Sequence, residues 1–460
     1  QPEIETVPDA WNTAATKGLA EGESSIETWW SVFDDATLTS LIDRARTSNL
    51  TLREAVWRVE EARALRGIAV GQRVPQVGVS GDATRTEASK NGPLGEVVPG
   101  EFFEAQDLYD LGVGASWELD LWGRIRRQVE AADAEMQASV EDYRDVLVAL
   151  FAEVATSYVD VRAFQERLRF AHANVEGQED TLRLTRDRFD AGLVSALDVA
   201  QAESNLANTK ALIPSLELQQ ELALNRLAVL LGTNPGAVHD ELTAEAPIPT
   251  EPDAVMRGLP ADLLRQRPDM RSAERRLAAQ TARIGVATAE LYPQFSLSGF
   301  LGLQSVEAGE LFSSDSVNWS IGLPIRWRIF EGGALRSQIA AEEARTAQLI
   351  ASYEQTVLLA LEEVEDAMIT YQKEVSRRAR LAESVDATQR SLELVLTQYT
   401  AGLTDFQNVL DTQRSLLQRE DQYAESEGIV INALVALYRA LGGGWDPDTA
   451  QPPVAPAEEG

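Results

Sequence analysis

The architecture of this chain follows from two stretches, QFSLSGFLGLQ at residues 294–304 and WSIGLPIRW at residues 319–327. In both, apolar side chains alternate with polar or small ones, so one face of an extended strand meets an apolar medium and the other a polar one. A similar alternation occupies residues 111–119, and Val77 and Val79 begin a fourth, weaker strand. The pattern therefore predicts strands near residues 76–87, 108–119, 294–304 and 318–327.

These predicted strands have the length that a membrane requires. A tilted strand crosses a bilayer in about 9 to 11 residues. Trp117, Trp319 and Trp327 lie near strand ends, where aromatic side chains gather at a membrane interface. The same alternation also suits an antiparallel sheet that packs on its own core. The length and the tryptophans favour lipid.

The number of strands predicts an oligomer if the strands lie in a membrane. A closed barrel needs at least about eight strands. Open sheet edges are not tolerated in hydrocarbon, because their backbone groups would lack hydrogen-bond partners. Several copies of the chain must therefore contribute strands to one barrel.

The chain is a tandem duplication. A shift of 210 positions aligns its halves without a gap from about Gly123 to Gly232, and a shift of 218 aligns the segments before that block. The difference of eight corresponds to a longer loop between Asp82 and Asp110 in the first half. Matched segments include Pro75-Gln76 with Pro293-Gln294, and Ala191-Gly192-Leu193 with Ala401-Gly402-Leu403.

Each half is predicted to contain unusually long helices. A helix of about 40 residues leads into Pro75 or Pro293, and a proline-free stretch of about 67 residues follows the strands. At 1.5 Å per residue the latter spans roughly 100 Å. Its apolar residues are three and four positions apart, as in helices packed side by side. They are Tyr143, Leu147, Phe151, Val154, Tyr158 and Val161, and in the second half Tyr353, Val357, Leu361, Val364, Met368, Tyr371 and Val375.

A second long helix returns in each half after an Ala-Gly-Leu break. The return helices begin near Ser195 and Thr404, and Pro214 is expected to disturb the first of them. Gly192 and Gly402 suit the left-handed conformation that ends a helix. Each half is therefore predicted to form a long helical hairpin.

Composition excludes several classes of function. The formal net charge of −32 argues against a nucleic-acid partner, and the absence of cysteine excludes disulfides and thiolate metal sites. The acidity suits either a solvated surface or a water-filled lumen lined with carboxylates. His172 and His239 lack ligand spacing, so neither a metal nor another cofactor is expected. Without a phosphate-binding loop or a nucleophile elbow, the chain is not expected to be an enzyme.

Several segments point to one family. They are Trp29-Trp30, WELDLWG at residues 117–123, RQRPD at 265–269, DTQRSL at 411–416 and LGGGW at 441–445. With the duplication, the strands and the hairpins, they resemble the TolC-type outer-membrane efflux channels. The likeness is greatest to the lipoprotein branch of that family, the OprM and NodT group, and covers about Glu27 to Trp445.

The resemblance implies a mixed α and β membrane protein. Its homotrimer would close a twelve-stranded transmembrane β-barrel, four strands from each protomer, continued by a long α-helical, coiled-coil-like barrel in the periplasm. The implied partners are a periplasmic adaptor, an inner-membrane transporter of the resistance-nodulation-division type and outer-membrane lipid. The channel would export drugs or other toxic solutes across the Gram-negative outer membrane. Members of this branch carry a lipidated cysteine, which here would precede Gln1.

The resemblance also implies a gate at the hairpin ends. Asp411 matches an aspartate that constricts the pore, and Tyr399 and Arg414 match members of a polar network that holds the ends together. Asp405 and Asp198 are expected to add to the acidic ring. Thr400 stands where relatives have arginine, and Asn408 where a second aspartate ring can occur, so this network is expected to differ here. The other interpretation of Asp411 is a solvent-facing acid near a helix N-terminus.

The two hairpin ends, with Ala191, Gly192 and Leu193 in the first and Ala401, Gly402 and Leu403 in the second, resemble the family's adaptor-docking motif. A simple tight turn would need the same residues. An alternative function is the secretion of proteins through the same kind of channel. A soluble coiled-coil scaffold belongs to another class and leaves the alternating strands unexplained.

The predicted organisation has five parts. Residues 1–35 form an N-terminal extended segment, and residues 233–260 connect the two repeats. The repeats themselves occupy residues 36–232 and 261–442. The last part, residues 443–460, is rich in proline and acid and is expected to be disordered.

Overall fold

The computed structural model describes residues 8, 10–13, 19–20, 26–89, 91, 104–252, 255–256 and 260–446. The chain divides into two compact units, each of which draws on both sequence repeats. Unit 1 comprises residues 1–59, 140–272 and 353–460, and unit 2 comprises residues 60–139 and 273–352. Most of the predicted disordered tail and much of the longer first-half loop lie outside the described residues.

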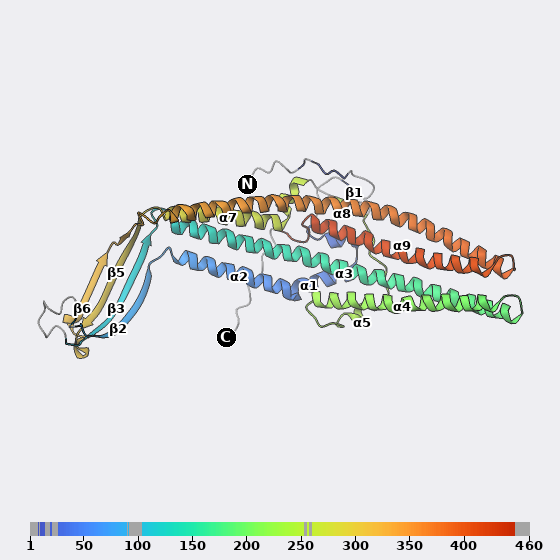
Figure 1. Ribbon diagram of the computed structural model, residues 1–460, viewed down its shortest axis with the longest axis horizontal. Helices are drawn as coiled ribbons and strands as arrows, with labels where there is room; N and C mark the ends of the chain where they lie inside the picture. Colours follow the sequence, from blue (N-terminus) through green and yellow to red (C-terminus); the bar gives the residue numbers. More distant parts are fainter. Residues whose placement is uncertain are drawn as a thin grey trace. The chain divides into compact units, whose positions relative to one another are not determined.

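Unit 2 contains an antiparallel sheet (Figure 1). Its strands run in the order β2-β3-β5-β6, and β7 pairs with β5. Their bounds are β2 Gln76–Thr86, β3 Gln106–Leu119, β5 Gln294–Ser305, β6 Val317–Gly322 and β7 Ile325–Arg326. Three predicted strands agree with these bounds within two residues. The fourth, predicted near 318–327, is divided at Pro324, which has no backbone N–H to donate and whose carbonyl accepts from the Ser296 amide at 3.1 Å.

One face of this sheet is apolar and exposed. The register places Val79, Val113, Leu301 and Trp319 opposite one another across the strands. Their exposed fractions are 78%, 46%, 61% and 72% respectively. In a water-soluble sheet this row would pack against a core. Here, no described part of the chain buries these four side chains.

The opposite face of the sheet contains a close aromatic contact. The Phe300 ring lies against Gly112, where an added Cβ would be 2.3 Å from Phe300 Cζ. A larger side chain at position 112 would displace the ring or separate the strands. Glycine is therefore required there for steric reasons rather than for backbone freedom.

In both repeats a tryptophan side chain of the sheet region donates a hydrogen bond to the backbone just before the repeat's first strand. The Trp117 indole donates to the Arg73 carbonyl at 3.0 Å, and the Trp327 indole donates to the Leu291 carbonyl at 3.1 Å. These pairs are related by the two sequence shifts, 210 for the tryptophans and 218 for the acceptors. The duplication is thus preserved in individual hydrogen bonds.

The helices repeat with the same spacing. In the first repeat they are α1 Ala36–Ser48, α2 Leu50–Gly71, α3 Arg124–Asp190 and α4 Ala196–Leu230. In the second they are α6 Leu263–Gln266, α7 Pro268–Ala289, α8 Ala334–Thr400 and α9 Phe406–Ala440. Helices α3 and α8 both contain 67 residues, and α4 and α9 both contain 35. Among the described helices, none is both long and apolar enough to cross a membrane.

Shorter elements occupy the connections. Helix α5 covers His239–Leu242, and strand β1 Leu19–Ala20 pairs in parallel with β4 Val255–Met256. Short 3-10 helices lie at Trp29–Phe33, Pro260–Asp262, Ala308–Glu310 and Ser314–Ser316. The connector predicted as residues 233–260 therefore contains some regular structure.

Two predictions about helix continuity are wrong. The helix of about 40 residues expected before each proline is two helices, divided at Asn49 in the first repeat and at Arg267 in the second. At Asn49 the side-chain oxygen accepts from the Leu52 amide at 2.8 Å, which caps the new helix. Pro214, expected to disturb α4, does not interrupt it: the helix continues from Ala196 to Leu230.

The same two residues close each repeat. The Asn49 side-chain amide group donates to the Leu230 carbonyl at 2.8 Å, and the Arg267 guanidinium donates to the Ala440 carbonyl at 2.9 Å. Each acceptor is the last residue of its repeat's return helix, where carbonyls have no intrahelical partner. The glycines two positions later, Gly232 and Gly442, have φ of +66° and +80°. The end of each repeat is thus joined to its beginning.

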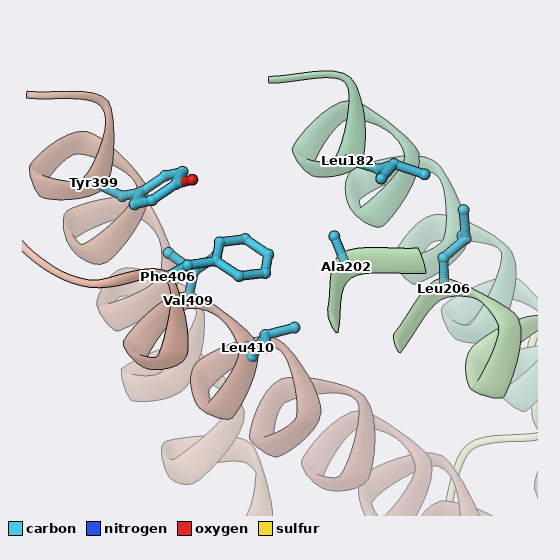
Figure 2. Packing of buried hydrophobic residues seen from close by; sticks show 7 residues of the cluster. All are labelled: Leu182, Ala202, Leu206, Tyr399, Phe406, Val409 and Leu410. Carbon is cyan, nitrogen blue, oxygen red and sulfur yellow. The ribbon is translucent and has the colours of Figure 1, made fainter. Parts of the chain in front are cut away.

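The core of unit 1 follows the predicted apolar stripes. Phe151, Val154 and Tyr158 of α3 are at most 1% exposed, and so are Val357 and Val364 of α8. A cluster of seven buried side chains lies farther along, between the two hairpins (Figure 2). Its members are Leu182, Ala202, Leu206, Tyr399, Phe406, Val409 and Leu410.

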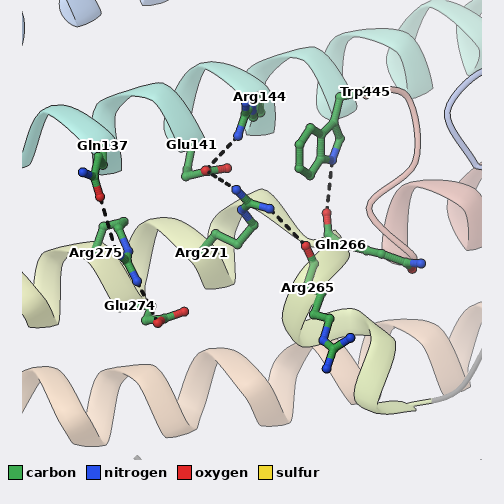
Figure 3. A network of polar contacts seen from close by, with 9 residues as sticks. All are labelled: Gln137, Glu141, Arg144, Arg265, Gln266, Arg271, Glu274, Arg275 and Trp445. Atoms are coloured by element: carbon green, nitrogen blue, oxygen red, sulfur yellow. Dashed lines mark hydrogen bonds and ion pairs between the residues drawn. The ribbon is translucent and has the colours of Figure 1, made fainter. Parts of the chain in front are cut away.

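The C-terminal end of the described chain is anchored by arginines (Figure 3). The guanidinium carbons of Arg144 and Arg271 lie 4.6 and 5.1 Å from the Trp445 ring, and both groups bind Glu141 at 2.8 Å. The Trp445 indole donates to the Gln266 carbonyl at 3.1 Å. These cation–π contacts help to hold the buried Trp445 ring in place.

Candidate functional site at the hairpin tips

Two helical hairpins form the predicted site, α3–α4 and α8–α9, which we call the first and second hairpins (Figure 1). Both turn in the same way. Gly192 and Gly402 have φ of +74°. In the first tip the Leu193 amide donates to the Arg188 carbonyl at 2.8 Å, and in the second the Leu403 amide donates to the Gln398 carbonyl at 2.8 Å. This bonding satisfies terminal carbonyls and requires a left-handed residue.

The tips present apolar side chains to solvent. Leu193 is 66% exposed and Leu403 is 77% exposed, and Ala191 and Ala401 beside them are exposed as well. A turn that served only to reverse the chain would not need leucine at this place. The geometry satisfies the turn requirement and leaves the leucines available for contact.

Asp411 lies on the exposed side of α9. Its carboxylate accepts from Gln407 at 2.9 Å, and Asn408, one turn earlier, donates to the Thr404 hydroxyl at 2.8 Å. Val409 and Leu410 point the other way into the buried cluster. The helix dipole acts most strongly within the first turn. Asp411 is the sixth residue of α9 and lies beyond that turn. Both interpretations of Asp411, a constricting acid and a solvent-facing acid, stay predictions.

Tyr399 and Arg414, predicted to share one network, have different partners. Tyr399 is only 2% exposed and its ring lies 5.4 Å from that of Phe406 (Figure 2). Burial raises the pKa of the Tyr399 hydroxyl above its ordinary value. Arg414 instead donates to the Asn205 side chain of the first hairpin at 3.0 Å. Both residues thus hold the hairpins of one chain together, at separate points.

The remaining predicted acids lie at the starts of the return helices. Asp405 is the residue before α9 and is exposed, without a side-chain hydrogen bond to the helix amides. Asp198 lies in the first turn of α4 and accepts from the Ser195 hydroxyl at 3.2 Å. Each occupies a position where the helix dipole stabilises a negative charge. Their membership of an acidic ring stays a prediction.

Sequence reasoning missed the residue that joins the two tips. Arg188, in the last turn of α3, donates to the Thr400 carbonyl at 2.7 Å, and its guanidinium lies 4.9 Å from the Tyr399 ring. Its place in a last helical turn was visible in the sequence. Its partners, more than 200 positions away, were not.

A polar seam, also missed, lies behind the tips. Along α3 the buried side chains Asn174, Gln178, Thr181 and Thr185 recur at spacings of four, three and four, where apolar residues are usual. On α9 the matching buried residues are Gln413 and Glu420. Gln413 donates to Thr181 at 2.8 Å, and Glu420 accepts from Asn174 and from Gln389 of α8.

Glu427, farther along α9, gives a pH-dependent prediction. Burial raises the pKa of its carboxyl above the ordinary value. The Tyr423 hydroxyl, which donates to this carboxyl at 2.7 Å, offsets the rise only in part. The folded protein therefore binds this proton more tightly than the unfolded chain. We expect Glu427→Gln to raise the thermal midpoint at pH 7, and the advantage to shrink as the pH falls through the raised pKa.

Glu425→Gln is the matched control, because Glu425 is exposed and carries the same charge two positions away. Circular dichroism melts of both variants between pH 4 and 8 make the comparison. An advantage for Glu427→Gln that grows at low pH, or equal behaviour of the two variants, would contradict the assignment.

The chain matches known proteins over most of its length. The family model described as outer membrane efflux protein matches residues 41–233 and 259–443. Nodulation protein T of Rhizobium leguminosarum is 31% identical over 428 residues, with 93% of this chain and 90% of the relative covered. The pyoverdine export outer membrane protein OpmQ of Pseudomonas aeruginosa is 32% identical, with 96% of this chain and 92% of the relative covered.

Solved structures agree with the sequence matches. The outer-membrane channel OprN superposes with a TM-score of 0.89 at 38% identity, over 97% of this chain and 99% of the other. The open-state structure of the Neisseria gonorrhoeae MtrE outer membrane channel gives a TM-score of 0.82 at 28% identity, over 97% of this chain and 98% of the other.

Proposed function

This chain belongs to the outer membrane efflux protein family, and from that membership we propose that it is the outer-membrane channel of a tripartite efflux pump. In this proposal the inner-membrane transporter is of the resistance-nodulation-division type, and a periplasmic adaptor connects it to the channel. The channel conducts drugs or other small toxic solutes passively and catalyses no reaction. The relative named above for pyoverdine export supports an exporting role.

The exposed apolar face of the sheet is the observation that carries the proposal. Val79, Leu301 and Trp319 are each more than 60% exposed in one chain. At about 25 cal/mol for each Å² of apolar surface, leaving such a face in water is costly. Acyl chains of the outer membrane would cover this face and remove that cost. A soluble scaffold would leave the face in water.

The sheet edges support an oligomer, which we take to be a trimer. In the described sheet, β2 and β6 lie at its two ends, so each leaves one edge of backbone groups without a strand partner. Such edges must be paired in hydrocarbon. Three copies would supply twelve strands, more than the roughly eight that enclose a pore.

Helix surfaces of unit 1 support the same assembly. Leu218, Leu222 and Val229 form an exposed stripe on α4, and Leu358 and Ile369 are exposed on α8. Their exposed fractions lie between 45% and 56%. In the proposed trimer, neighbouring copies cover these stripes and the helices enclose a periplasmic tunnel.

The proposal is tested on the purified full chain. We expect extraction from membranes to require detergent, native mass spectrometry to give three copies, and the trimer to form cation-preferring pores in planar bilayers. A chain that stays monomeric and soluble in buffer would overturn the proposal. Pores that pass a folded protein would favour protein secretion.

Asp411→Ala is expected to raise single-channel conductance severalfold and to weaken the preference for cations. Three copies of this exposed carboxylate around one axis would narrow the pore and attract cations. The measurement is conductance and reversal potential in asymmetric salt. Asp411→Asn tests the charge alone, and Asn408→Ala, one turn away, tests loss of a neutral side chain. Equal conductance of Asp411→Ala and the unsubstituted channel would remove Asp411 from the gate.

A further inference from the structure

In unit 2, a carboxylate of the first repeat binds the start of helix α3. Asp120 accepts from the Ile125 amide at 3.0 Å and from the Arg126 amide at 2.9 Å. The Arg126 guanidinium donates to the same carboxylate at 3.3 Å. The first amides of a helix lack intrahelical partners and carry partial positive charge, so they favour an anion. In the first repeat, Asp120 is that anion.

The second repeat keeps these donors but has a different residue in the place of the acid. The shift of 210 positions that relates the repeats puts Leu335 and Arg336, at the start of α8, where the two amide donors stand in α3. It puts Phe330 in the place of Asp120. Among the described residues, no carboxylate accepts a hydrogen bond from the Leu335 amide, the Arg336 amide or the Arg336 guanidinium. The equivalent donors of the second repeat are thus available to an anion from outside the chain.

A pocket lies at these donors. Its volume is about 360 Å³, and most of its wall comes from the segment 327–336. The charged residues that line it are Arg328, Glu331 and Arg336. Arg328 pairs with Glu290 at 2.5 Å and with Glu331 at 3.5 Å, so these charges are largely balanced. Arg336 is therefore the lining cation that can serve a ligand.

The same pocket has an apolar, exposed border. Ile329 is 80% exposed and Phe330 is 90% exposed. Both follow strand β7 at the end of the sheet nearest α8 (Figure 1). Trp122 and Tyr292, which stack with their ring centroids 4.9 Å apart, lie at this end as well and are exposed. Aromatic side chains gather at such a level where a barrel leaves the membrane. The pocket thus combines donors for an anion with a surface for hydrocarbon.

We propose that this pocket binds the phosphate of a membrane phospholipid. The Leu335 and Arg336 amides and the Arg336 guanidinium hold the phosphate, as their counterparts hold Asp120, and Ile329 and Phe330 lie against the acyl chains. Helix N-termini and arginine both suit phosphate oxygens. This inference rests on the proposed function, which places the sheet in the outer membrane and the pocket at its periplasmic face. A free phosphate ion would make no use of the exposed apolar border.

Lipid binding to the full trimer tests the pocket. The purified channel in detergent is titrated with phosphatidylglycerol, and native mass spectrometry counts the lipids that it retains. We expect one firmly held lipid for each protomer. Arg336→Gln should weaken this binding about tenfold, as expected for the loss of a hydrogen bond to a charged group.

The first repeat supplies the matched control. Arg126→Gln removes the same charge at the equivalent position, where Asp120 already occupies the donors. It should bind lipid as the parent does. Equal binding by the parent and Arg336→Gln, or equal losses in the two arginine variants, would overturn the proposal.

Phe330→Asp tests the site from the opposite direction. It gives the second repeat the acid of the first, so the new carboxylate should occupy the donors and abolish lipid binding. Phe330→Leu keeps an apolar side chain and should retain most of it. Parental binding by Phe330→Asp would overturn the proposal, and so would loss of the trimer in Phe330→Leu, because the ring would then lie between protomers.

Inorganic phosphate distinguishes a lipid from a free anion. It should displace the lipid only at a concentration far above that of the lipid, because it lacks acyl chains. Displacement at equal concentration would reject the lipid as the occupant.

The outcomes separate this proposal from that of the channel. A trimer that forms pores, but retains lipid equally in the parent and Arg336→Gln, keeps the channel and rejects the pocket. A monomer that is soluble in buffer rejects the channel. Calorimetry of that monomer with dihexanoyl phosphatidylglycerol, a water-soluble lipid, then decides the pocket by itself: binding that Arg336→Gln weakens supports it, and equal binding rejects it.

Discussion

Replacing Arg267 by alanine should destabilise the folded chain by about 3–5 kcal/mol, the range for removing one partner of a buried ion pair. The Arg267 side chain is only 10% exposed. It binds both oxygens of Asp269, at 3.1 and 2.7 Å, and Glu363 at 2.7 Å. It also donates to the Ala440 carbonyl at the end of the last helix. Burial alone would lower the pKa of the guanidinium, but these carboxylates raise it, so the group stays charged.

Thermal unfolding followed by circular dichroism measures the loss. Arg265→Ala is the control, because this exposed arginine two residues earlier has no described side-chain partner (Figure 3). Its melting point should remain that of the parent. Adding Asp269→Asn to Arg267→Ala should recover part of the stability, since it removes a partly buried carboxylate that has lost its cation. Equal melting points for the two alanine variants would contradict the assigned role.

Gly192→Glu should abolish efflux while leaving the trimer assembled. The backbone at Gly192 has φ of +74°, and an added Cβ would meet nothing within 4 Å. The substitution therefore strains only the turn, by roughly 1–2 kcal/mol, while it places a charge beside the exposed Leu193. If the tips dock on an adaptor, a charge at this apolar contact costs far more than the strain itself.

Drug susceptibility of cells and native mass spectrometry of the extracted protein are the two measurements. Gly192→Asn is the matched control, because asparagine tolerates the left-handed conformation and carries no charge. We expect near-normal resistance from it. Gly402 is less suitable, since a side chain there would lie 3.7 Å from the Arg188 guanidinium. Normal resistance with Gly192→Glu would show that the first tip does not dock.

Most of the fold could be predicted because its signals are local. The alternation around Phe295 and the proline-free stretches after Gly123 and Gly333 reflect the periods of strand and helix, which any sequence displays directly. The duplication added an internal check, because the same lengths occur twice. The missed helix breaks at Asn49 and Arg267 had weaker local signals, although Asn49 has the residue type of a helix cap.

The candidate site was predictable only in part. Asp411 and Asn408 could be placed on one helical face by their spacing of three. The separation of Tyr399 from Arg414, and the contact of Arg188 with Thr400, could not be inferred. Each depends on which faces of two hairpins meet, and neighbouring positions on a helix point in directions about 100° apart.

The sequence alone thus determined the repeated order of strands and long helices, because periodicity and chain-breaking residues act over a few neighbouring positions. Only the tertiary structure decided which polar groups meet across the hairpins, such as Gln413 with Thr181 and Arg188 with Thr400. Those partners are more than 200 positions apart, and their contact depends on the rotation of packed helices, which hydrophobic periodicity constrains without specifying individual pairs.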